Sequence, residues 1–353
     1  MIGAARGGGG GETGAGATAF LRPITRQDIP ACVRVFDLAE GALYDRLNQE
    51  LPPSDPSSLE RLLEHLLEHD PGLAWLAEPP SSTADPAPPP VLGFGAALQR
   101  ENAWHLSLLY VRPDAQREGL GRRIFIACLP KGPRLSDAGP DGGTLDGSGE
   151  SRTDEGRTVA RGTLTVCTDA VQPVSTGLYA TYGLVPRVPI YTALGRPAPG
   201  SFPDLPAGVA ATGFEALDAG LDLAAALDAV DRATLGHVRP VDHALWQSEG
   251  HRGVMFHRAG DGETLGYGYT SPAGRLGPLA LLDPVMTAGA LGVLFKRETP
   301  PGAWVTLVPG PCDRALVALL RAGFRFEGFP GLFASTRPVL AFDRYLPFSF
   351  ALP

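Results

Sequence analysis

One short stretch of the chain combines residue types suited to holding a phosphate group. Residues 116–122 read Gln-Arg-Glu-Gly-Leu-Gly-Arg, so Gly119 and Gly121 stand two positions apart among arginines. Glycines let the main chain approach a ligand without a Cβ in the way. Where such a loop leads into a helix, several main-chain N–H groups point toward one position and favour an anion. We therefore predict that this loop binds a diphosphate.

The loop differs from two common nucleotide-binding loops. A P-loop requires a Gly-Lys-Ser/Thr ending, and no lysine, serine or threonine occurs in residues 116–122. A dinucleotide-binding fingerprint requires a third glycine three residues after the second, where this chain has Ile124. The elements around the loop are nevertheless clear. The apolar run 104–111 predicts a buried strand before it, and residues 124–129 predict a helix after it.

In this position the loop resembles the Gln/Arg-x-x-Gly-x-Gly/Ala loop of the GNAT superfamily of acyl-CoA-dependent acetyltransferases. A second stretch, residues 172–184, resembles the family's helix Asn-Pro-x-Ala-x-x-Leu-Tyr-x-x-x-Gly-Phe. Leu178, Tyr179 and Gly183 stand at the family's spacing, whereas Gln172 replaces the asparagine and Leu184 the phenylalanine. The two stretches follow each other in the family's order.

The resemblance implies an α/β fold in which a mixed, mostly antiparallel sheet is flanked by helices. It also implies acetyl-CoA as cosubstrate, with its pantetheine arm lying along the strand at Leu109, Tyr110 and Val111. The diphosphate would meet the loop, whose residues are Gln116, Arg117, Glu118, Gly119, Leu120, Gly121 and Arg122. The reaction implied is transfer of an acyl group from a thioester to an amine.

Candidates for proton transfer follow from the same resemblance. Tyr179 matches the family's acid, and a phenol with a pKa of about 10 can protonate a thiolate whose thiol has a pKa of about 8.5. The alternative for Tyr179 is a buried aromatic on the helix. Many family members keep a glutamate eleven residues before the loop, where this chain has His105. His105 is either the base or a hydrogen-bonded strand residue, and Glu40 and Tyr44 are weaker candidates on the segment that usually lines the acceptor site.

The order of predicted elements repeats along the chain. We expect a flexible tail at 1–17, a GNAT domain at 18–195 with a disordered insertion at about 130–160, a linker at 196–208, and a degenerate GNAT-like copy at 209–353. The copy is called degenerate because Leu282–Gly289, at the place of its loop, contains no Gly-x-Gly. We expect one acetyl-CoA site per chain.

Length, charge and composition restrict the functional classes to which the protein can belong. The 353 residues are enough for two domains, and a net charge of −8 gives no broad basic surface for nucleic acid or anionic membranes. No apolar run approaches the roughly 20 residues that span a bilayer. Four cysteines without a Cys-x-x-Cys pair suggest reduced thiols in a cytoplasmic protein. The acceptor expected is a small-molecule amine or a peptide N-terminus, and the sequence leaves the oligomeric state open.

Two other functional classes were weighed. Residues 65–69, His-Leu-Leu-Glu-His, fit a metalloprotease helix signature. The leucines of this helix are predicted to form its buried face, which would turn both histidines to solvent, so we expect no metal. The second alternative is a non-catalytic acyl-CoA-binding or scaffold protein of the same fold. It is suggested by Gln172 in place of asparagine and by the short helix that ends before Pro130.

Overall fold

The computed structural model describes residues 19–51, 55–80, 89–130, 150–152, 158–160, 162–217 and 221–353. The predicted tail at 1–17 and most of the predicted insertion at 130–160 lie outside these ranges. The chain forms two compact units, the first from 1–97 and 108–130 and the second from 98–107 and 131–353. Strands β3 (Gly93–Arg100) and β4 (Ala103–Val111) each contribute one part to each unit.

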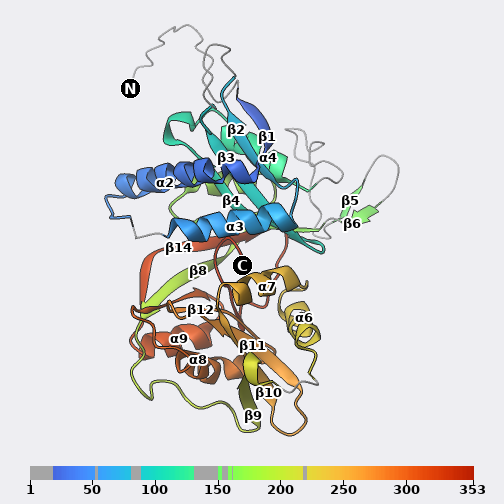
Figure 1. Ribbon diagram of the computed structural model, residues 1–353, viewed down its shortest axis with the longest axis vertical. Helices are drawn as coiled ribbons and strands as arrows, with labels where there is room; N and C mark the ends of the chain where they lie inside the picture. Colours follow the sequence, from blue (N-terminus) through green and yellow to red (C-terminus); the bar gives the residue numbers. More distant parts are fainter. Residues whose placement is uncertain are drawn as a thin grey trace, which may run out of the picture. The chain divides into compact units, whose positions relative to one another are not determined.

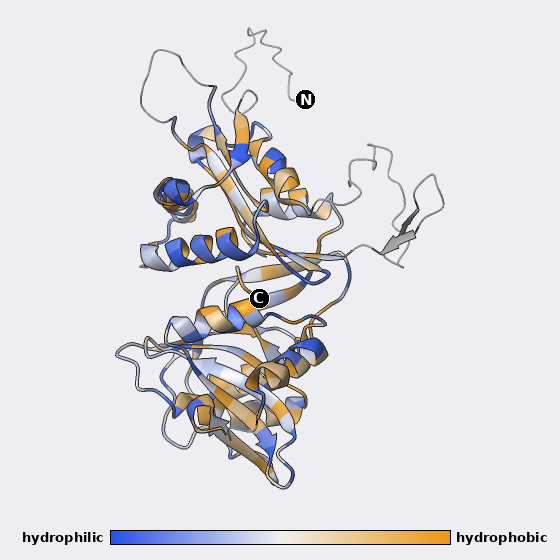
Figure 2. Cartoon of the chain, turned by 45° about the vertical axis from the view of Figure 1, so that its right-hand side comes forward, coloured by the Kyte–Doolittle hydropathy of each residue, from blue (hydrophilic) through white to orange (hydrophobic). Residues whose placement is uncertain are grey.

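The first unit is a small sheet with helices on both faces. Besides its parts of β3 and β4, it contains β1 (Phe20–Pro23), η1 (Arg26–Asp28), α2 (Ile29–Arg46), α3 (Pro56–His69), β2 (Ala74–Glu78), η2 (Pro113–Ala115) and α4 (Leu120–Cys128), with strands in the order β1-β2-β3-β4 (Figure 1). Tyr110 of β4 packs against Phe36 of α2, with ring centroids 4.9 Å apart. The neighbouring Leu109 and Ile124 of α4 both lie against Gly95. Successive side chains of a strand point to opposite faces, so α2 and α4 cover opposite faces of this sheet (Figure 2).

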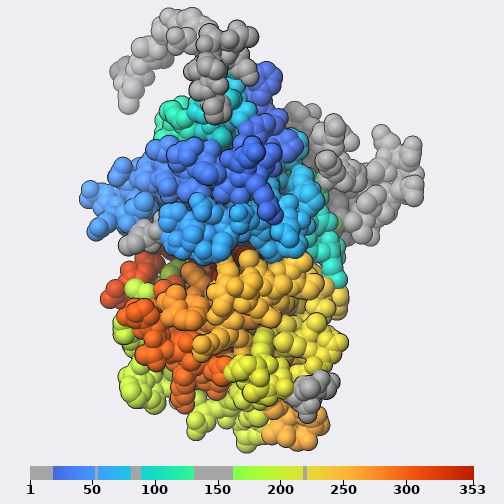
Figure 3. Space-filling view, in the orientation of Figure 1, coloured from blue at the N-terminus to red at the C-terminus, as the bar shows by residue number. Residues whose placement is uncertain are grey.

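Local sequence signals explain where these helices begin. Asp55 precedes α3, and its carboxylate accepts a hydrogen bond from the Ser57 N–H at 3.0 Å, which satisfies one of the free donors of the first turn. Leu63 and Leu66 are buried on α3, and α3 packs along α2 without a visible gap (Figure 3). The expectation that His65 faces solvent is wrong, because the buried side of α3 is wider than its leucine stripe. His65 is only 6% exposed and its ring lies 4.7 Å from that of His69.

The second unit contains the rest of the elements. They are β5 (Glu150–Arg152), β6 (Thr158–Ala160), β7 (Thr163–Asp169), α5 (Pro173–Ala180), β8 (Val185–Gly195), β9 (Val209–Gly213), η4 (Phe214–Ala216), α6 (Leu223–Thr234), α7 (Pro240–Ser248), β10 (Arg252–Arg258), β11 (Thr264–Thr270), β12 (Arg275–Leu281), η5 (Pro284–Met286), α8 (Thr287–Phe295), β13 (Trp304–Pro309), α9 (Asp313–Arg321), β14 (Arg325–Ser335) and β15 (Tyr345–Leu346). The strand order is β4-β7-β14-β8-β13-β12-β11-β10-β9, β15 pairs with β12, and β5 and β6 form a separate pair.

The same succession of elements occurs twice along the chain. Leaving out β5 and β6, residues 20–195 run β-η-α-α-β-β-β-η-α-β-α-β, and residues 209–335 run through the same twelve elements. We call these the first and second repeats. The last strand of each repeat joins the other repeat's strands, because β14 lies between β7 and β8 while β8 also pairs with β13. Sheet pairing therefore does not follow chain order.

The predicted fold class is confirmed, since the structure is a mixed, mostly antiparallel sheet flanked by helices. Some predicted elements were wrong or missed. The pattern of residues 185–194 predicts two strands interrupted at Pro189, whereas β8 is one strand through Pro189, and β14 shifts register beside it. Six helices and strands were not predicted, namely β5, β6, β9, α7, β14 and β15, and the first two lie in the segment that was expected to be disordered. Within the described residues, no helix is both long enough and apolar enough to cross a membrane.

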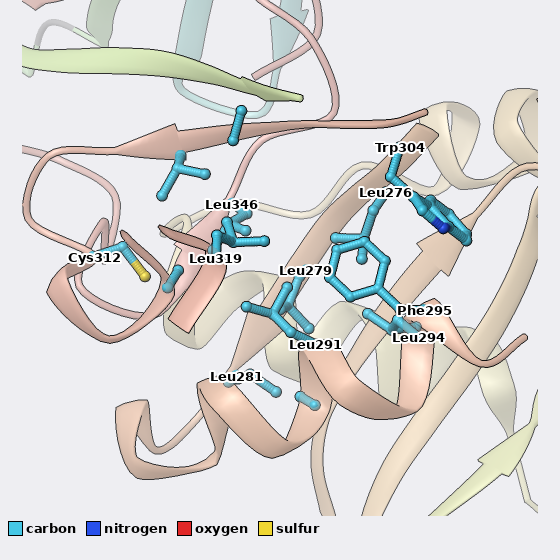
Figure 4. Close-up of a cluster of buried hydrophobic side chains, with 14 of the residues drawn as sticks. Leu276, Leu279, Leu281, Leu291, Leu294, Phe295, Trp304, Cys312, Leu319 and Leu346 are labelled. Atoms are coloured by element: carbon cyan, nitrogen blue, oxygen red, sulfur yellow. The ribbon is translucent and has the colours of Figure 1, made fainter. Parts of the chain in front are cut away.

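The largest apolar cluster of the second unit lies between β12, α8 and α9. Leu279, Leu291 and Leu319 are fully buried in it, and Figure 4 shows Leu346 of β15 among them. A fully buried leucine contributes roughly 2 kcal/mol by the apolar area it removes from water. This packing fixes the C-terminal strand β15 against the second repeat.

A polar cluster is buried beside this core. Arg239 is 2% exposed and its Nε donates to Asp231 at 3.1 Å, while Asp231 is completely buried. Asp231 also accepts from Tyr267 and lies 3.0 Å from His243 Nε2. Burial alone would raise the pKa of Asp231, but Arg239 and His243 outweigh it and lower that pKa. The Asp231 carboxylate is therefore charged, and this buried charge is stabilised by Arg239 and His243.

We expect Arg239→Met to lower the free energy of unfolding by about 3–5 kcal/mol, since it leaves the Asp231 charge buried without its main partner. Chemical denaturation measures the change. Arg258→Met is the matched control, because Arg258 pairs with Asp261 at 3.1 Å with both side chains more than half exposed. Arg258→Met should lower the free energy of unfolding by about 1 kcal/mol or less. Equal losses in both variants would contradict the importance of the buried pair.

Candidate active site

The predicted diphosphate loop connects β4 to α4 in the first unit. After η2 the main chain turns through Arg117 and Gly119, which have φ values of 70° and 77°. α4 begins at Leu120, so the N–H groups of 120–122 belong to the first turn, where an α-helix has no partners for them. Ile124 and Phe125 of α4 are fully buried, which holds this end of the helix in place. The prediction of strand, loop and helix is met by the structure.

The loop leaves room beside its glycine. A Cβ built on Gly119 would meet no atom within 4 Å, and one built on Gly121 would meet only Val111 Cγ2, at 3.7 Å. Gln116 is turned back by a hydrogen bond from its Nε2 to the Val111 carbonyl at 2.9 Å. Gln116, Arg117 and Arg122 are exposed. The loop therefore presents main-chain donors and cationic side chains to open space.

The end of β4 has main-chain groups suited to an extended ligand. The N–H of Arg112 donates to the Leu92 carbonyl at 2.9 Å, so residue 112 is bonded toward β3. Main-chain groups of successive strand residues point to opposite edges. The N–H and C=O groups of Leu109 and Val111 therefore lie on the edge away from β3. Tyr110 does not share that edge and contributes its ring to α2 instead.

Glu40 and Tyr44 are placed on α2, one turn apart. Both side chains are half-buried. Since Phe36 of the same helix packs on Tyr110, α2 covers the strand that leads into the loop. The structure thus brings the predicted acceptor-site helix and the predicted cosubstrate strand together within the first unit.

Tyr179 lies on α5 in the second unit and is 4% exposed. Its carbonyl accepts from the Leu184 N–H at 3.1 Å, while Gly183 has a φ of 81° and bonds to Ala180. This is the glycine-ended helix terminus known as the Schellman motif, in which the two flanking apolar residues also pack together. The spacing of Tyr179, Gly183 and Leu184 thus has a structural reason that is independent of any chemistry by the phenol.

His105 lies near the beginning of β4, in the second unit, and is 2% exposed. Its Nε2 is 2.9 Å from the Phe350 carbonyl, and its Nδ1 is 2.9 Å from Thr165 Oγ1. A carbonyl only accepts, so Nε2 carries the proton, and the single hydroxyl proton of Thr165 is shared between Nδ1 and the Trp104 carbonyl, which lies 3.0 Å from Oγ1. Burial lowers the pKa of His105 to about 4. The imidazole is therefore neutral near pH 7, and both ring nitrogens have partners.

His105 lines a cavity of about 110 Å³ within the second unit. The opposite walls come from distant parts of the sequence, including His237, Arg239, Arg337 and the C-terminal residues Leu352 and Pro353. None of these five was predicted as a site residue. No motif marks them, because the cavity forms only where the second repeat and the C-terminal segment close over β4 and β7.

The cysteines provide no activated nucleophile. All four are free thiols. Burial raises the pKa of Cys32, Cys128 and Cys312 to about 12, and it raises that of Cys167 well above its usual value. In the part of the chain that the structure describes, no group of three His, Cys, Asp or Glu side chains is arranged to hold a metal ion.

The second repeat has a different structure at the corresponding place. There η5 leads directly into α8, so no loop separates them. Asp283 accepts a hydrogen bond from the Val285 N–H at 2.8 Å, which occupies one main-chain donor with a carboxylate. On the edge of β12 away from β11, β15 forms the pairs Leu279 with Leu346 and Ala280 with Tyr345. The edge that would receive an extended ligand is thus occupied by the chain itself.

Comparison with known proteins places this geometry in a recognised fold. No protein-family model matches the sequence, and no curated protein matches it. Solved structures do match. A Pyrococcus horikoshii protein proposed to be an acetyltransferase has a TM-score of 0.63 at 17% identity, covering 95% of this chain and 96% of its own.

Two further solved structures match this chain along nearly its whole length. A GCN5-related N-acetyltransferase from Sphaerobacter thermophilus has a TM-score of 0.54 at 15% identity, over 92% of this chain and 97% of its own. A tandem GNAT protein from the clavulanic acid biosynthesis pathway has a TM-score of 0.51 at 14% identity, over 91% and 99%. The chain therefore has the GNAT fold, as its two motifs suggested. At these identities the likeness establishes the fold alone.

The buried histidines predict how stability depends on pH. Burial lowers the pKa of both His105 and His237 to about 4, whereas a histidine in the unfolded chain titrates near 6.5. Between these values the unfolded chain binds more protons, so stability falls as the pH decreases from about 6.5 to 4. Each histidine should account for a loss on the order of 3 kcal/mol.

Denaturation at a series of pH values measures this loss in the wild type and in His105→Gln. We expect the variant to lose less stability over the same interval, whatever its stability at neutral pH. His69→Gln is the control, since His69 is exposed and its replacement should leave the slope unchanged. An unchanged slope in His105→Gln would show that the imidazole is not held neutral by the fold.

Proposed function

We propose that the protein is an acetyl-CoA-dependent N-acetyltransferase whose first repeat is catalytic. The observation that carries this proposal is the passage from β4 through the Gly119 loop into α4. That passage offers a strand edge, first-turn N–H groups that the helix itself does not use, and open space around Gly119. We also propose that the two repeats are tandem GNAT domains, the first at 18–195 and the second at 209–353, joined by a linker at 196–208.

The residues present fit acetyl-CoA in two respects. The N–H groups of Leu120, Gly121 and Arg122 would bind the diphosphate, because a helix N-terminus favours negative charge. Arg117 and Arg122, both exposed, would add positive charge beside it. The main-chain groups of Leu109 and Val111 would hydrogen-bond the pantetheine arm in the manner of a neighbouring strand. The bound cosubstrate supplies a thioester-activated acetyl group.

The reaction proposed forms one bond and breaks one. The nitrogen of the acceptor amine bonds to the acetyl carbon, and the carbon–sulfur bond of the thioester breaks. The amine must lose a proton and the departing sulfur must gain one or be stabilised. We assign the second task to Tyr179, whose phenol is the proposed proton donor.

Two residues are candidates for the base that takes the proton from the amine. His105 is neutral at pH 7, which is the form that accepts a proton, but Nδ1 would have to exchange its Thr165 contact for the amine. Glu40 is the second candidate, since it lies on α2 in the first unit. Activity retained at neutral pH in His105→Gln would assign the role to Glu40. The acceptor proposed is a small-molecule amine or a peptide N-terminus.

We propose that the second repeat binds no acetyl-CoA and has a structural role. Three features support this. The edge of β12 is paired with β15, Asp283 sets a negative charge where a diphosphate would lie, and Asp204 and Leu205 of the linker lie close against Gly289 of α8. The free cysteines fit a reducing compartment, so we also propose a cytoplasmic location.

The proposed activity is tested by mixing the purified protein with acetyl-CoA and a panel of amines while free thiol is measured. We expect thiol release with at least one amine. The second candidate function is a non-catalytic acyl-CoA-binding protein, favoured by the occupied ring nitrogens of His105. Saturable acetyl-CoA binding without thiol release from any amine would support that candidate and contradict the enzyme.

Gly119→Val should abolish acetyl-CoA binding, because the side chain would fill the space where the diphosphate is expected. Gly72→Val is the matched control, since Gly72 also has a positive φ, of 89°, and open space around a Cβ, but it lies away from the loop. Both variants carry similar backbone strain. Calorimetric titration should give one site per chain in the wild type and in Gly72→Val, and none in Gly119→Val. Two sites, or a site that survives Gly119→Val, would show that the second repeat binds acetyl-CoA.

Tyr179→Phe should lower kcat by about 10²-fold with little change in the KM for acetyl-CoA, as expected for a group that acts in the transition state. Phenylalanine keeps the apolar contacts of α5, so stability should change little. Tyr182→Phe, three residues along, is the matched control and should leave kcat within about twofold of the wild type. A full kcat in Tyr179→Phe would make this residue a structural aromatic of the helix terminus.

A further inference from the structure

The cavity lined by His105 has mostly apolar walls. The apolar residues that line it are Leu98, Leu235, Val339, Leu340 and Leu352. Its volume of about 110 Å³ corresponds to between three and four molecules of liquid water at roughly 30 Å³ each. The wall also contains polar side chains, among them His105, His237 and Arg337, so an occupant that combines a polar group with an apolar body matches this space.

Two of the three arginines that line the cavity are already neutralised. Arg100 donates to both carboxylate oxygens of Asp242, at 2.9 and 2.6 Å, and both side chains are buried. Arg239 is paired with Asp231 and also donates to the main-chain oxygen of Pro353 at 2.8 Å. These pairs form rigid, charge-balanced parts of the wall.

Arg337 differs from the other two. Its Nε donates to Thr163 Oγ1 at 2.7 Å, and Thr163 is a neutral partner. Among the described residues, no carboxylate forms an ion pair with Arg337. Its side chain is exposed while it lines the cavity, so this positive charge can be reached from solvent. The hydrogen bond to Thr163 fixes the guanidinium and leaves its two terminal nitrogens for a ligand.

We propose that this cavity binds a small carboxylate with a short apolar body, whose carboxylate is held by Arg337. The planar fork of a guanidinium matches a carboxylate with two parallel hydrogen bonds. An ammonium ion would be repelled by the Arg337 guanidinium. A free phosphate would satisfy Arg337 but would leave the apolar walls against a strongly hydrated ion. This inference goes beyond the proposed acetyl transfer, because it requires neither acetyl-CoA nor turnover.

The experiment is a calorimetric titration of the full chain, without acetyl-CoA, using butyrate as the probe. Butylamine tests the charge at matched size, and inorganic phosphate tests the apolar walls. We expect saturable binding of butyrate and at least roughly tenfold weaker binding of both other probes. Arg337→Gln should weaken butyrate binding by about tenfold or more, since it removes a charge-assisted hydrogen bond. Arg321→Gln, an exposed arginine at the end of α9 that does not line the cavity, should retain the wild-type affinity.

A second variant fills the space without changing charge. Val339→Phe should remove butyrate binding while Arg337 is unchanged. The proposal is overturned if butyrate does not bind, if butylamine or phosphate binds as tightly, or if Arg337→Gln keeps the wild-type affinity in a folded protein. Because thiol release is not measured, failure of this proposal leaves the acetyltransferase proposal standing, and the reverse is also true.

Discussion

The second unit depends on the insertion of β14 between β7 and β8. A strand with an open edge leaves a row of N–H and C=O groups without partners, which is costly when they are buried. β14 supplies partners to both neighbours, pairing Phe333 with Cys167 on one side and with Val188 on the other. β8 in turn pairs with β13. The last strand of each repeat therefore completes the other repeat's sheet, and neither set of strands is complete without both repeats.

The exchange of strands explains why two similar repeats can differ in function. Each repeat contains a short parallel pair, β4 with β7 and β12 with β13, in which only the beginnings of the two strands are paired. In the second repeat β15 pairs farther along β12, and Leu346 anchors it in the apolar core. In the first repeat the groups of Leu109 and Val111 lie on the corresponding edge, away from β3. The edge of β12 is thus paired with the C-terminal strand β15, and we propose that the corresponding edge of β4 receives an extended ligand.

Buried ion pairs stabilise the second repeat, and their arginines line part of the cavity. Asp231 and Arg239, and likewise Asp242 and Arg100, satisfy each other away from water, which is the condition under which buried ions are tolerated. Of the three arginines that line the cavity, Arg337 is the one without a carboxylate partner among the described residues. Charge balance in the interior therefore decides which arginine is available to a ligand.

The sequence by itself determined the elements that depend on local patterns. The apolar strand 104–111, the glycines of the loop and the helix that ends before Pro130 are all properties of neighbouring residues, and the structure has them where they were expected. The GNAT fold could be inferred for the same reason, because its two motifs are local. The residues predicted to form the site lie on these elements, and their chemical roles are proposed.

Tertiary structure decided everything that depends on pairing between distant segments. β14 and β15 lack a distinctive pattern, and they are strands because β7, β8 and β12 offer them unpaired edges. His105 is neutral because Phe350, 245 positions later, meets its ring and buries it. The cavity and the availability of Arg337 likewise arise from segments that sequence order keeps far apart. Local sequence patterns do not predict such contacts, because the contacts form and contribute free energy only when distant segments meet in the folded chain.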